Sequence, residues 1–367
     1  MPNLQDHVTA AVDQTLQERP FDELDALVLS QLVYMPLEGV EMPANVGAAW
    51  PHIERHTGAM DLFQKKRREL FRICAGLPRY RSWRIADYVN IIDQEKQMQF
   101  CACTFILPDG ERCIAFRGTD SHVIGWKEDF NMSFTIVPAQ HAAAQYVLRA
   151  ASQPGPIRLC GHSKGGNLGV YAAATADAHT RAAIRAVYTF DGPGMDEETF
   201  HSEGYALVHD RIESYIPHSS VVGMLLWEDP SYTVVRSSAL GILQHDAMTW
   251  QIRDGAFVVM DAVDTASRLT DEAVTAWLAQ LDEAQRRLLV DTVYQVVEAS
   301  QAVVLSDLST DVLDNAARML SALRGLDTAV RRDVLRMFQL LIRTGADGVA
   351  REILGTLLSL RKEKTKE

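Results

Sequence analysis

Residues 161–165 read Gly-His-Ser-Lys-Gly, which places a serine hydroxyl between two glycines at the spacing G-x-S-x-G. The preceding residues 157–160 are short and apolar, as in a buried parallel strand. The following residues 168–174 are rich in alanine and predict a helix. A nucleophilic serine on such a corner needs small neighbours, because strand and helix approach closely there. The pattern predicts Ser163 as a nucleophile rather than a bystander in a glycine-rich turn, with the Lys164 N–H facing the reacting carbonyl.

A serine hydroxyl is a weak nucleophile and needs a base that is oriented by a third group. In sheet-based hydrolases the order along the chain is serine, acid, histidine, and the histidine follows a late strand. His245 comes after the last predicted core strand, at residues 232–235, and is the first candidate for the base. His218 is the second candidate.

Asp191 is the first candidate for the acid because it ends the predicted strand 186–190, the next one after the serine. Ligand-binding groups of open α/β sheets lie at that carboxyl edge. Asp before glycine is also a common turn cap, which is the alternative for this residue. Glu213 and Asp229 are the other acids that the chain order allows.

The second half of an oxyanion hole normally comes from the loop after an earlier strand. The predicted strand 113–116 runs into Arg117, Gly118 and Thr119. Gly118 permits a close approach, and Thr119 offers a backbone N–H and its hydroxyl. We interpret Arg117 as a structural anchor.

The remaining pattern predicts an α/β protein. Helices are expected over residues 4–35, 53–74 and 139–151, and strands over 88–93, 99–105 and 211–216 as well as those above. Strands that alternate with helices imply a mostly parallel sheet covered on both faces. The basic run at 65–68 is interpreted as a solvated helix face. We expect a hydrolase domain over residues 1–262, whose residues 1–80 are a helical extension, and a C-terminal helical segment over residues 263–367 that packs on the core or on a partner.

Composition limits the class of protein. The chain has 367 residues, 47% of them hydrophobic, and a formal net charge of −12, which argues against nucleic acid as a partner. The five cysteines lack metal-site spacing and suit small apolar fillers in a reduced compartment, so no metal or other cofactor is expected. Neither a secretory signal nor an apolar run of about 18 residues is present, so we expect a cytoplasmic protein without a transmembrane segment.

Four segments together resemble the class 3 lipase branch of the α/β-hydrolases. They are Phe-Arg-Gly-Thr at 116–119, Gly-Trp-Lys-Glu-Asp at 125–129, Gly-His-Ser-Lys-Gly-Gly at 161–166 and Thr-Phe-Asp-Gly-Pro-Gly at 189–194. The lipase resemblance covers roughly residues 85 to 250, and the same segments look still more like an uncharacterised bacterial lipase-like family. The resemblance implies the α/β-hydrolase fold, Ser163 as nucleophile, His245 as base, and Thr119 and Lys164 as the oxyanion hole.

Two positions depart from the lipase pattern. The lipase acid stands two or three residues before a Val-Pro pair, and Ser214 occupies its place here. The acid is therefore displaced, most simply to Asp191, or it is missing and the enzyme is weak. Lys164 stands where a neutral residue is usual, and its ammonium has Asp129, Asp191 or an anionic substrate group as possible partners.

These features predict a serine hydrolase that cleaves a small-molecule acyl ester or lipid-like substrate through an acyl-enzyme. A thioesterase, an amidase or an acyltransferase would use the same residues. A catalytically silent lipase-like scaffold that binds a protein through its C-terminal helices is the alternative from another class. The same helices are the expected contact of a possible homodimer.

Overall fold

The computed structural model describes residues 2–263 except 11–13, 56–59, 61, 121–122, 133–134, 221, 224–225, 227–230 and 240. Beyond residue 263 it describes only 280, 282, 284–285, 288, 291–292, 325, 327–330 and 332–333. The chain forms two compact units, one of residues 1–119 and 136–264 and the other of residues 120–135 and 265–367. Nearly all of the predicted C-terminal helical segment, with its expected contacts, lies outside the described residues.

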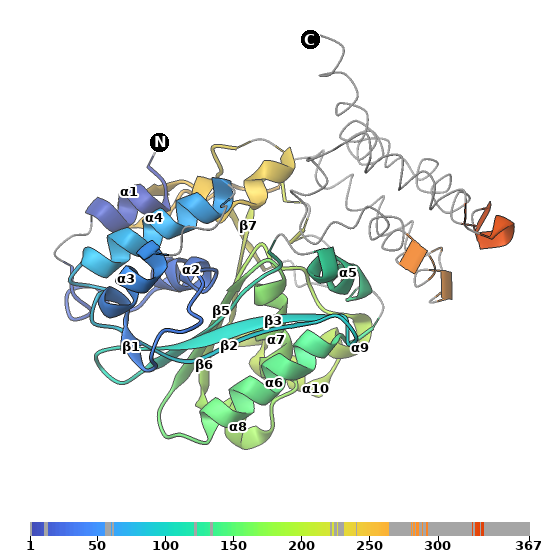
Figure 1. The fold of residues 1–367 in the computed structure, drawn as a ribbon, viewed down its shortest axis with the longest axis horizontal. Helices are drawn as coiled ribbons and strands as arrows, with labels where there is room; N and C mark the ends of the chain where they lie inside the picture. Colours follow the sequence, from blue (N-terminus) through green and yellow to red (C-terminus); the bar gives the residue numbers. More distant parts are fainter. Residues whose placement is uncertain are drawn as a thin grey trace, which may run out of the picture. The chain divides into compact units, whose positions relative to one another are not determined.

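The first unit is built on an eight-stranded sheet whose strands follow one another in chain order (Figure 1). Strands β1 to β4 pair antiparallel, whereas β4 to β8 pair parallel. This mostly parallel sheet confirms the expected α/β-hydrolase architecture. The strands are β1 Ala44–Asn45, β2 Arg84–Asp93, β3 Met98–Ile106, β4 Arg112–Phe116, β5 Ile157–His162, β6 Ile184–Phe190, β7 Ile212–Pro217 and β8 Thr233–Val235.

Helices cover both faces of the sheet. Figure 1 shows α1 to α4 on one face and α6, α7, α8 and α10 on the other. Their bounds are α1 Leu4–Ala10, α2 Glu23–Leu32, α3 Val46–Arg55, α4 Leu62–Gly76, α6 Pro138–Ala151, α7 Lys164–Ala174, α8 Ala178–Ala183, α9 Glu197–Phe200 and α10 Glu203–Val208. The second unit contains α5, Val123–Asn131. None of the helices in the described part of the chain is long and apolar enough to cross a bilayer.

Short elements complete the first unit. They are the 3₁₀ helices η1 His209–Arg211, η2 Gly241–His245 and η3 Ala247–Thr249, and the hairpin of β9 Ile252–Arg253 and β10 Ala256–Phe257. The segment around His245 that was predicted as a loop after β8, here named the histidine loop, therefore consists largely of the 3₁₀ helices η2 and η3.

The helical region expected over residues 4–35 contains two helices, α1 and α2. Asp22 starts the second one, since its carboxylate accepts hydrogen bonds from the N–H groups of Leu24 and Asp25. Pro20 lies just before this cap, where its ring would disrupt a continuous helix. The second predicted helix is also divided, into α3 and α4. Strand β2 begins at Arg84, before its predicted start at residue 88. A bulge between Ala86 and Val89 interrupts the alternation of side chains there, so the pattern did not include the first residues of the strand.

Helix α2 is buried along its length and forms part of the core. Its apolar side chains, Leu24, Leu27, Val28 and Leu32 among them, share one hydrophobic cluster with Cys160 of β5 and with residues of β4 and β6. Residues 1–80 are therefore a layer of the fold that covers the sheet.

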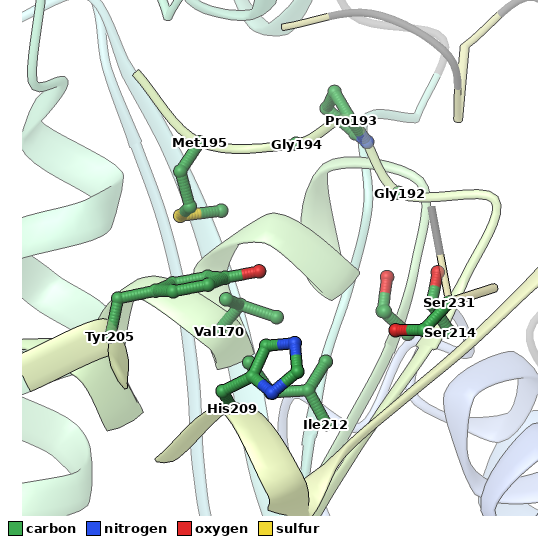
Figure 2. A pocket seen from close by; sticks show the side chains of 11 residues that line it. Val170, Gly192, Pro193, Gly194, Met195, Tyr205, His209, Ile212, Ser214 and Ser231 are labelled. Carbon is green, nitrogen blue, oxygen red and sulfur yellow. The ribbon is translucent and has the colours of Figure 1, made fainter. Parts of the chain in front are cut away.

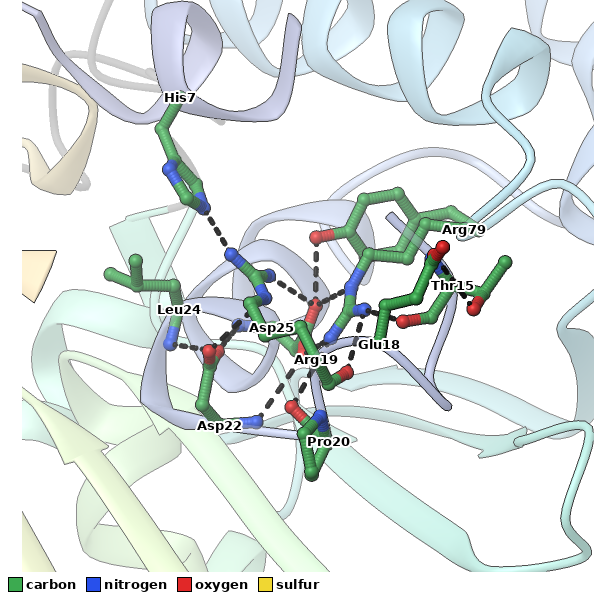
Figure 3. A network of polar contacts seen from close by, with 10 residues as sticks. His7, Thr15, Glu18, Arg19, Pro20, Asp22, Leu24, Asp25 and Arg79 are labelled. Atoms are coloured by element: carbon green, nitrogen blue, oxygen red, sulfur yellow. Dashed lines mark hydrogen bonds and ion pairs between the residues drawn. The ribbon is translucent and has the colours of Figure 1, made fainter. Parts of the chain in front are cut away.

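A network of polar contacts holds this layer together (Figure 3). The buried carboxylate of Asp25 accepts hydrogen bonds from Arg79 Nε, at 2.8 Å, and from the Tyr80 hydroxyl, at 2.8 Å. Arg79 also donates to the carbonyl oxygens of Thr15 and Arg19. The Arg19 guanidinium in turn lies 2.8 Å from Nε2 of His7 on α1. The network connects α1, α2 and the turn after α4. Its buried charges are paired with opposite charges or with carbonyl oxygens, which offsets the cost of removing them from water.

We expect His7 to make the first unit less stable in acid. Burial and the Arg19 guanidinium lower the pKa of His7 from 6.5 to about 4. Between these values the unfolded chain binds more protons than the folded one, so stability falls as the pH drops from about 6.5 towards 4. His7→Gln keeps an acceptor for Arg19 and removes the titration. Urea unfolding at neutral pH and at about pH 4.5 should show a smaller acid loss in His7→Gln than in the wild type.

The exposed His179 provides the matched control. His179→Gln should lose as much stability in acid as the wild type does. An equal acid loss in His7→Gln and the wild type would contradict the assignment to His7.

Candidate functional site

Ser163 lies between the last residue of β5 and the first residue of α7. Its backbone has φ +58° and ψ −135°, a conformation that residues other than glycine rarely adopt. The turn is held by a hydrogen bond from Ser163 N–H to the Phe190 carbonyl, at 2.9 Å, and by one from Gly166 N–H to the Ser163 carbonyl, at 2.9 Å. Such a strained serine between strand and helix is the geometry of a nucleophile elbow.

The glycines of the motif are required by the closeness of neighbouring backbone. A Cβ on Gly161 would lie 2.1 Å from the carbonyl carbon of Gly165, and a Cβ on Gly165 would lie 2.2 Å from the carbonyl oxygen of Phe116. A Cβ on Gly166 would lie 2.2 Å from Thr189 Oγ1. The missing side chains therefore allow α7 to begin directly against β4, β5 and β6.

Asp191 follows β6 and lies next to His245. The Asp191 Oδ2 atom is 2.6 Å from Nδ1 of His245. Its Oδ1 atom accepts hydrogen bonds from the Ser220 hydroxyl, at 2.5 Å, and from the Gly223 N–H, at 3.1 Å. The side chain is 1% exposed, so these donors replace the water that an ionised carboxylate would otherwise bind. Because a carboxylate only accepts, the proton in this contact lies on Nδ1 of His245.

The other residues considered for the acid and the base have different surroundings. Glu213 accepts a hydrogen bond from the Tyr215 hydroxyl, at 2.9 Å. The His218 ring contacts the backbone N–H of Ser237 and the side-chain amide of Gln244. Asp229 lies outside the described residues. Among the described acids that were considered, Asp191 is the one hydrogen-bonded to His245.

The serine segment and the histidine loop meet at His162, the residue before Ser163. The rings of His162 and His245 have centroids 4.6 Å apart, and Nε2 of His162 is 2.7 Å from the carbonyl oxygen of His245. Within the described residues, no hydrogen bond joins the Ser163 hydroxyl to His245. Such bonds are often long in substrate-free enzymes and tighten when the substrate binds.

Gly118, which follows β4 as predicted, lies beside the elbow, and Thr119 is the next residue of the chain. A Cβ on Gly118 would be 2.5 Å from the His162 carbonyl oxygen and 3.0 Å from Ser163 Cβ. The Thr119 hydroxyl is buried and has no hydrogen-bond partner among the described residues. Lys164 opens α7, so its N–H is one of those without an intrahelical acceptor. Arg117 donates to Asn90 Oδ1 at 2.9 Å, consistent with an anchoring role.

The side chains of Lys164 and of the basic run at residues 65–68 have partners that the sequence did not predict. Lys164 is 1% exposed, and its ammonium donates to the carbonyl oxygen of Gln99 in β3, at 3.1 Å. Asp191, one of its possible partners, instead binds His245. The basic run at 65–68 is not simply a solvated face, because Lys66 forms a 2.7 Å ion pair with Asp246 and the Arg67 guanidinium lies 3.6 Å over the Tyr34 ring.

A pocket lies between the carboxyl end of β6 and the first half of β7, next to α7 and α10. In Figure 2, Ser214 and Ser231 lie together on one side of it, and Tyr205 and Met195 lie on the other. Ser214, which occupies the place of the lipase acid, thus lines this pocket. Ser163, His245 and Asp191 are not among the lining residues.

Sequence reasoning missed three side chains that support the site: Ser220, Tyr34 and Lys66. For Tyr34, the available signal was His162. A histidine at the end of a buried apolar strand needs hydrogen-bond partners, and these had to come from elsewhere in the chain.

Comparisons with known proteins place the chain in a family. A family model described as Mbeg1-like matches residues 74–295. Among solved structures, the crystal structure of the M37 lipase is similar, at 16% sequence identity and a TM-score of 0.38, over 56% of this chain and 70% of that one. No curated protein shows significant similarity to the chain.

Proposed function

Because the chain belongs to the Mbeg1-like family and folds as a lipase-like α/β-hydrolase, we propose that it is a serine hydrolase that cleaves carboxylic esters through an acyl-enzyme intermediate. One observation carries the proposal: the 2.6 Å contact between Asp191 and His245, made beside a strained serine at a strand-to-helix corner. An acid, a histidine and a serine in this arrangement can generate a nucleophile at neutral pH.

In the proposed reaction, His245 Nε2 takes the proton from the Ser163 hydroxyl as Oγ attacks the ester carbonyl carbon. Asp191 keeps the other proton on Nδ1 and stabilises the imidazolium that forms. The tetrahedral intermediate collapses, the C–O bond to the alcohol breaks, and His245 returns its proton to the leaving alkoxide. Water then attacks the acyl-enzyme by the same steps and releases the carboxylic acid and Ser163.

The negative charge on the tetrahedral oxygen needs hydrogen-bond donors that are already in place. We assign this role to the N–H groups of Thr119 and Lys164. The buried Thr119 hydroxyl, unpartnered among the described residues, supports the assignment. Leaving such a group without a partner costs about 1–3 kcal/mol, and an oxyanion would provide the acceptor.

A fluorophosphonate probe tests the proposal directly, because it reacts with a serine only when the serine is activated. We expect one adduct per chain, located at Ser163 by peptide mass spectrometry, and ester cleavage across a chain-length series of p-nitrophenyl esters. Ser163→Ala should abolish labelling. Ser152→Ala, which removes an exposed serine, should not alter it. Failure of the wild type to react would favour the silent scaffold.

A further inference from the structure

His162 is a buried histidine inside the elbow motif, and both of its ring nitrogens face polar atoms. The residue is 3% exposed and ends β5. Its Nε2 atom lies 2.7 Å from the carbonyl oxygen of His245, which can only accept a hydrogen bond. The ring therefore carries a proton on Nε2 and donates it to the backbone of His245.

The opposite nitrogen is held by Tyr34, which follows α2. The Tyr34 hydroxyl lies 3.4 Å from Nδ1 of His162, which accepts in the neutral ring. Burial, and then the neighbouring His245 and Arg67, lower the pKa of His162 well below its ordinary value. His162 is therefore neutral at pH 7 with one tautomer fixed by its two contacts.

Tyr34 is itself held from the outer side by α4. The Arg67 guanidinium stacks 3.6 Å over its ring, and Arg67 Nε donates to Gln31 Oε1 at 3.0 Å. A Cβ on Gly118 would lie 2.4 Å from the Tyr34 hydroxyl and 3.0 Å from Ser163 Cβ. The hydroxyl therefore lies close to the elbow as well as to His162.

We propose that His162 is a positioning residue, which fixes the catalytic His245 through its backbone carbonyl and relies on the N-terminal helices for its own position. The inference rests on the proposed function. The residue after the catalytic histidine, Asp246, is anchored separately by the 2.7 Å ion pair with Lys66 of α4. The histidine loop is therefore held at two adjacent residues, at the His245 carbonyl by His162 and at Asp246 by Lys66, and Asp191 holds the His245 ring.

Such anchoring matters because the position of His245 Nε2 depends on the backbone that carries the ring. A displacement of about 1 Å in a reacting group can reduce the rate by a factor of about 10². The 3₁₀ helix η2 that ends at His245 has only five residues, so it provides few hydrogen bonds of its own.

The test compares His162→Met with His162→Gln. In glutamine Nε2 is as many bonds from the backbone as in histidine and also donates, whereas methionine has similar length without a donor. We expect His162→Met to lower kcat by about 10- to 100-fold with little change in KM, since a misplaced base slows the chemical step. His162→Gln should recover most of this loss. Equal activity of wild type and His162→Met, or equal losses in both variants, would overturn the proposal.

A second comparison separates positioning from a general effect on folding. In the His245→Ala background, adding His162→Met should change the residual rate by less than about twofold, because His162 acts through His245. A further tenfold loss there would overturn the proposal. Should His162→Met fail to fold, Tyr34→Phe decides, with a lowered kcat at constant KM as the supporting result and an unchanged kcat as the opposing one. Absence of probe labelling in the wild type would instead refute the proposed function.

Discussion

Replacing Ser163 by alanine is expected to reduce ester turnover by a factor of about 10⁴ to 10⁶, because the attacking oxygen is removed. The fold should persist. The hydrogen bonds that hold the elbow at this residue come from its backbone N–H and carbonyl, and both remain in alanine. Initial rates with p-nitrophenyl esters measure the loss, and circular dichroism checks the fold. Activity within tenfold of the wild type would rule out Ser163 as the nucleophile.

His245→Ala provides the companion measurement, since groups that act as one unit are not additive. The Ser163→Ala, His245→Ala double variant should be hardly less active than either single variant. His218→Ala is the matched control, because its ring contacts Ser237 and Gln244. A large loss in His218→Ala together with normal turnover in His245→Ala would assign the base to His218.

Asp191→Asn is expected to lower kcat by about 10⁴, the loss seen when the triad aspartate of a serine protease becomes asparagine. Asparagine tolerates the left-handed backbone of residue 191, where φ is +49°. Its carbonyl oxygen can still accept from Ser220 and Gly223. Its NH₂ group then faces His245 Nδ1 and moves the ring proton to Nε2, so that the base has no free electron pair for Ser163.

Glu213→Gln controls for the loss of a carboxylate near the sheet edge. We expect its kcat to stay within about threefold of the wild type, in the range of changes away from the reacting groups. If Asp191 were only a turn cap, asparagine would replace it with little effect. Normal turnover in Asp191→Asn with a large loss in Glu213→Gln would therefore assign the acid to Glu213.

The parts of the fold that depend on neighbouring residues were predictable. The apolar run before Ser163 and the glycines around it predicted the β5–α7 corner, because strand, turn and helix signals are all local there. The order of strands predicted a mostly parallel sheet. Chain order and position after a strand together selected Asp191 and His245, whose Oδ2 and Nδ1 atoms lie 2.6 Å apart.

What could not be predicted depends on residues distant in sequence. Lys66 and Asp246 are 180 positions apart, and no local pattern distinguishes such a lysine from a solvated one. The same holds for Tyr34 and His162, which are 128 positions apart.

The burial of α2 has a consequence for synthesis of the chain on the ribosome. Leu24 and its apolar neighbours are made about 90 residues before Cys113 of β4 and about 135 before Cys160 of β5, which share their hydrophobic cluster, so at 5–20 residues per second they wait roughly 5 to 30 seconds for these partners. During that interval an apolar helix is exposed without the sheet that later covers it. We therefore expect this apolar layer to need shielding from aggregation during synthesis, before the residues of the nucleophile elbow have been made.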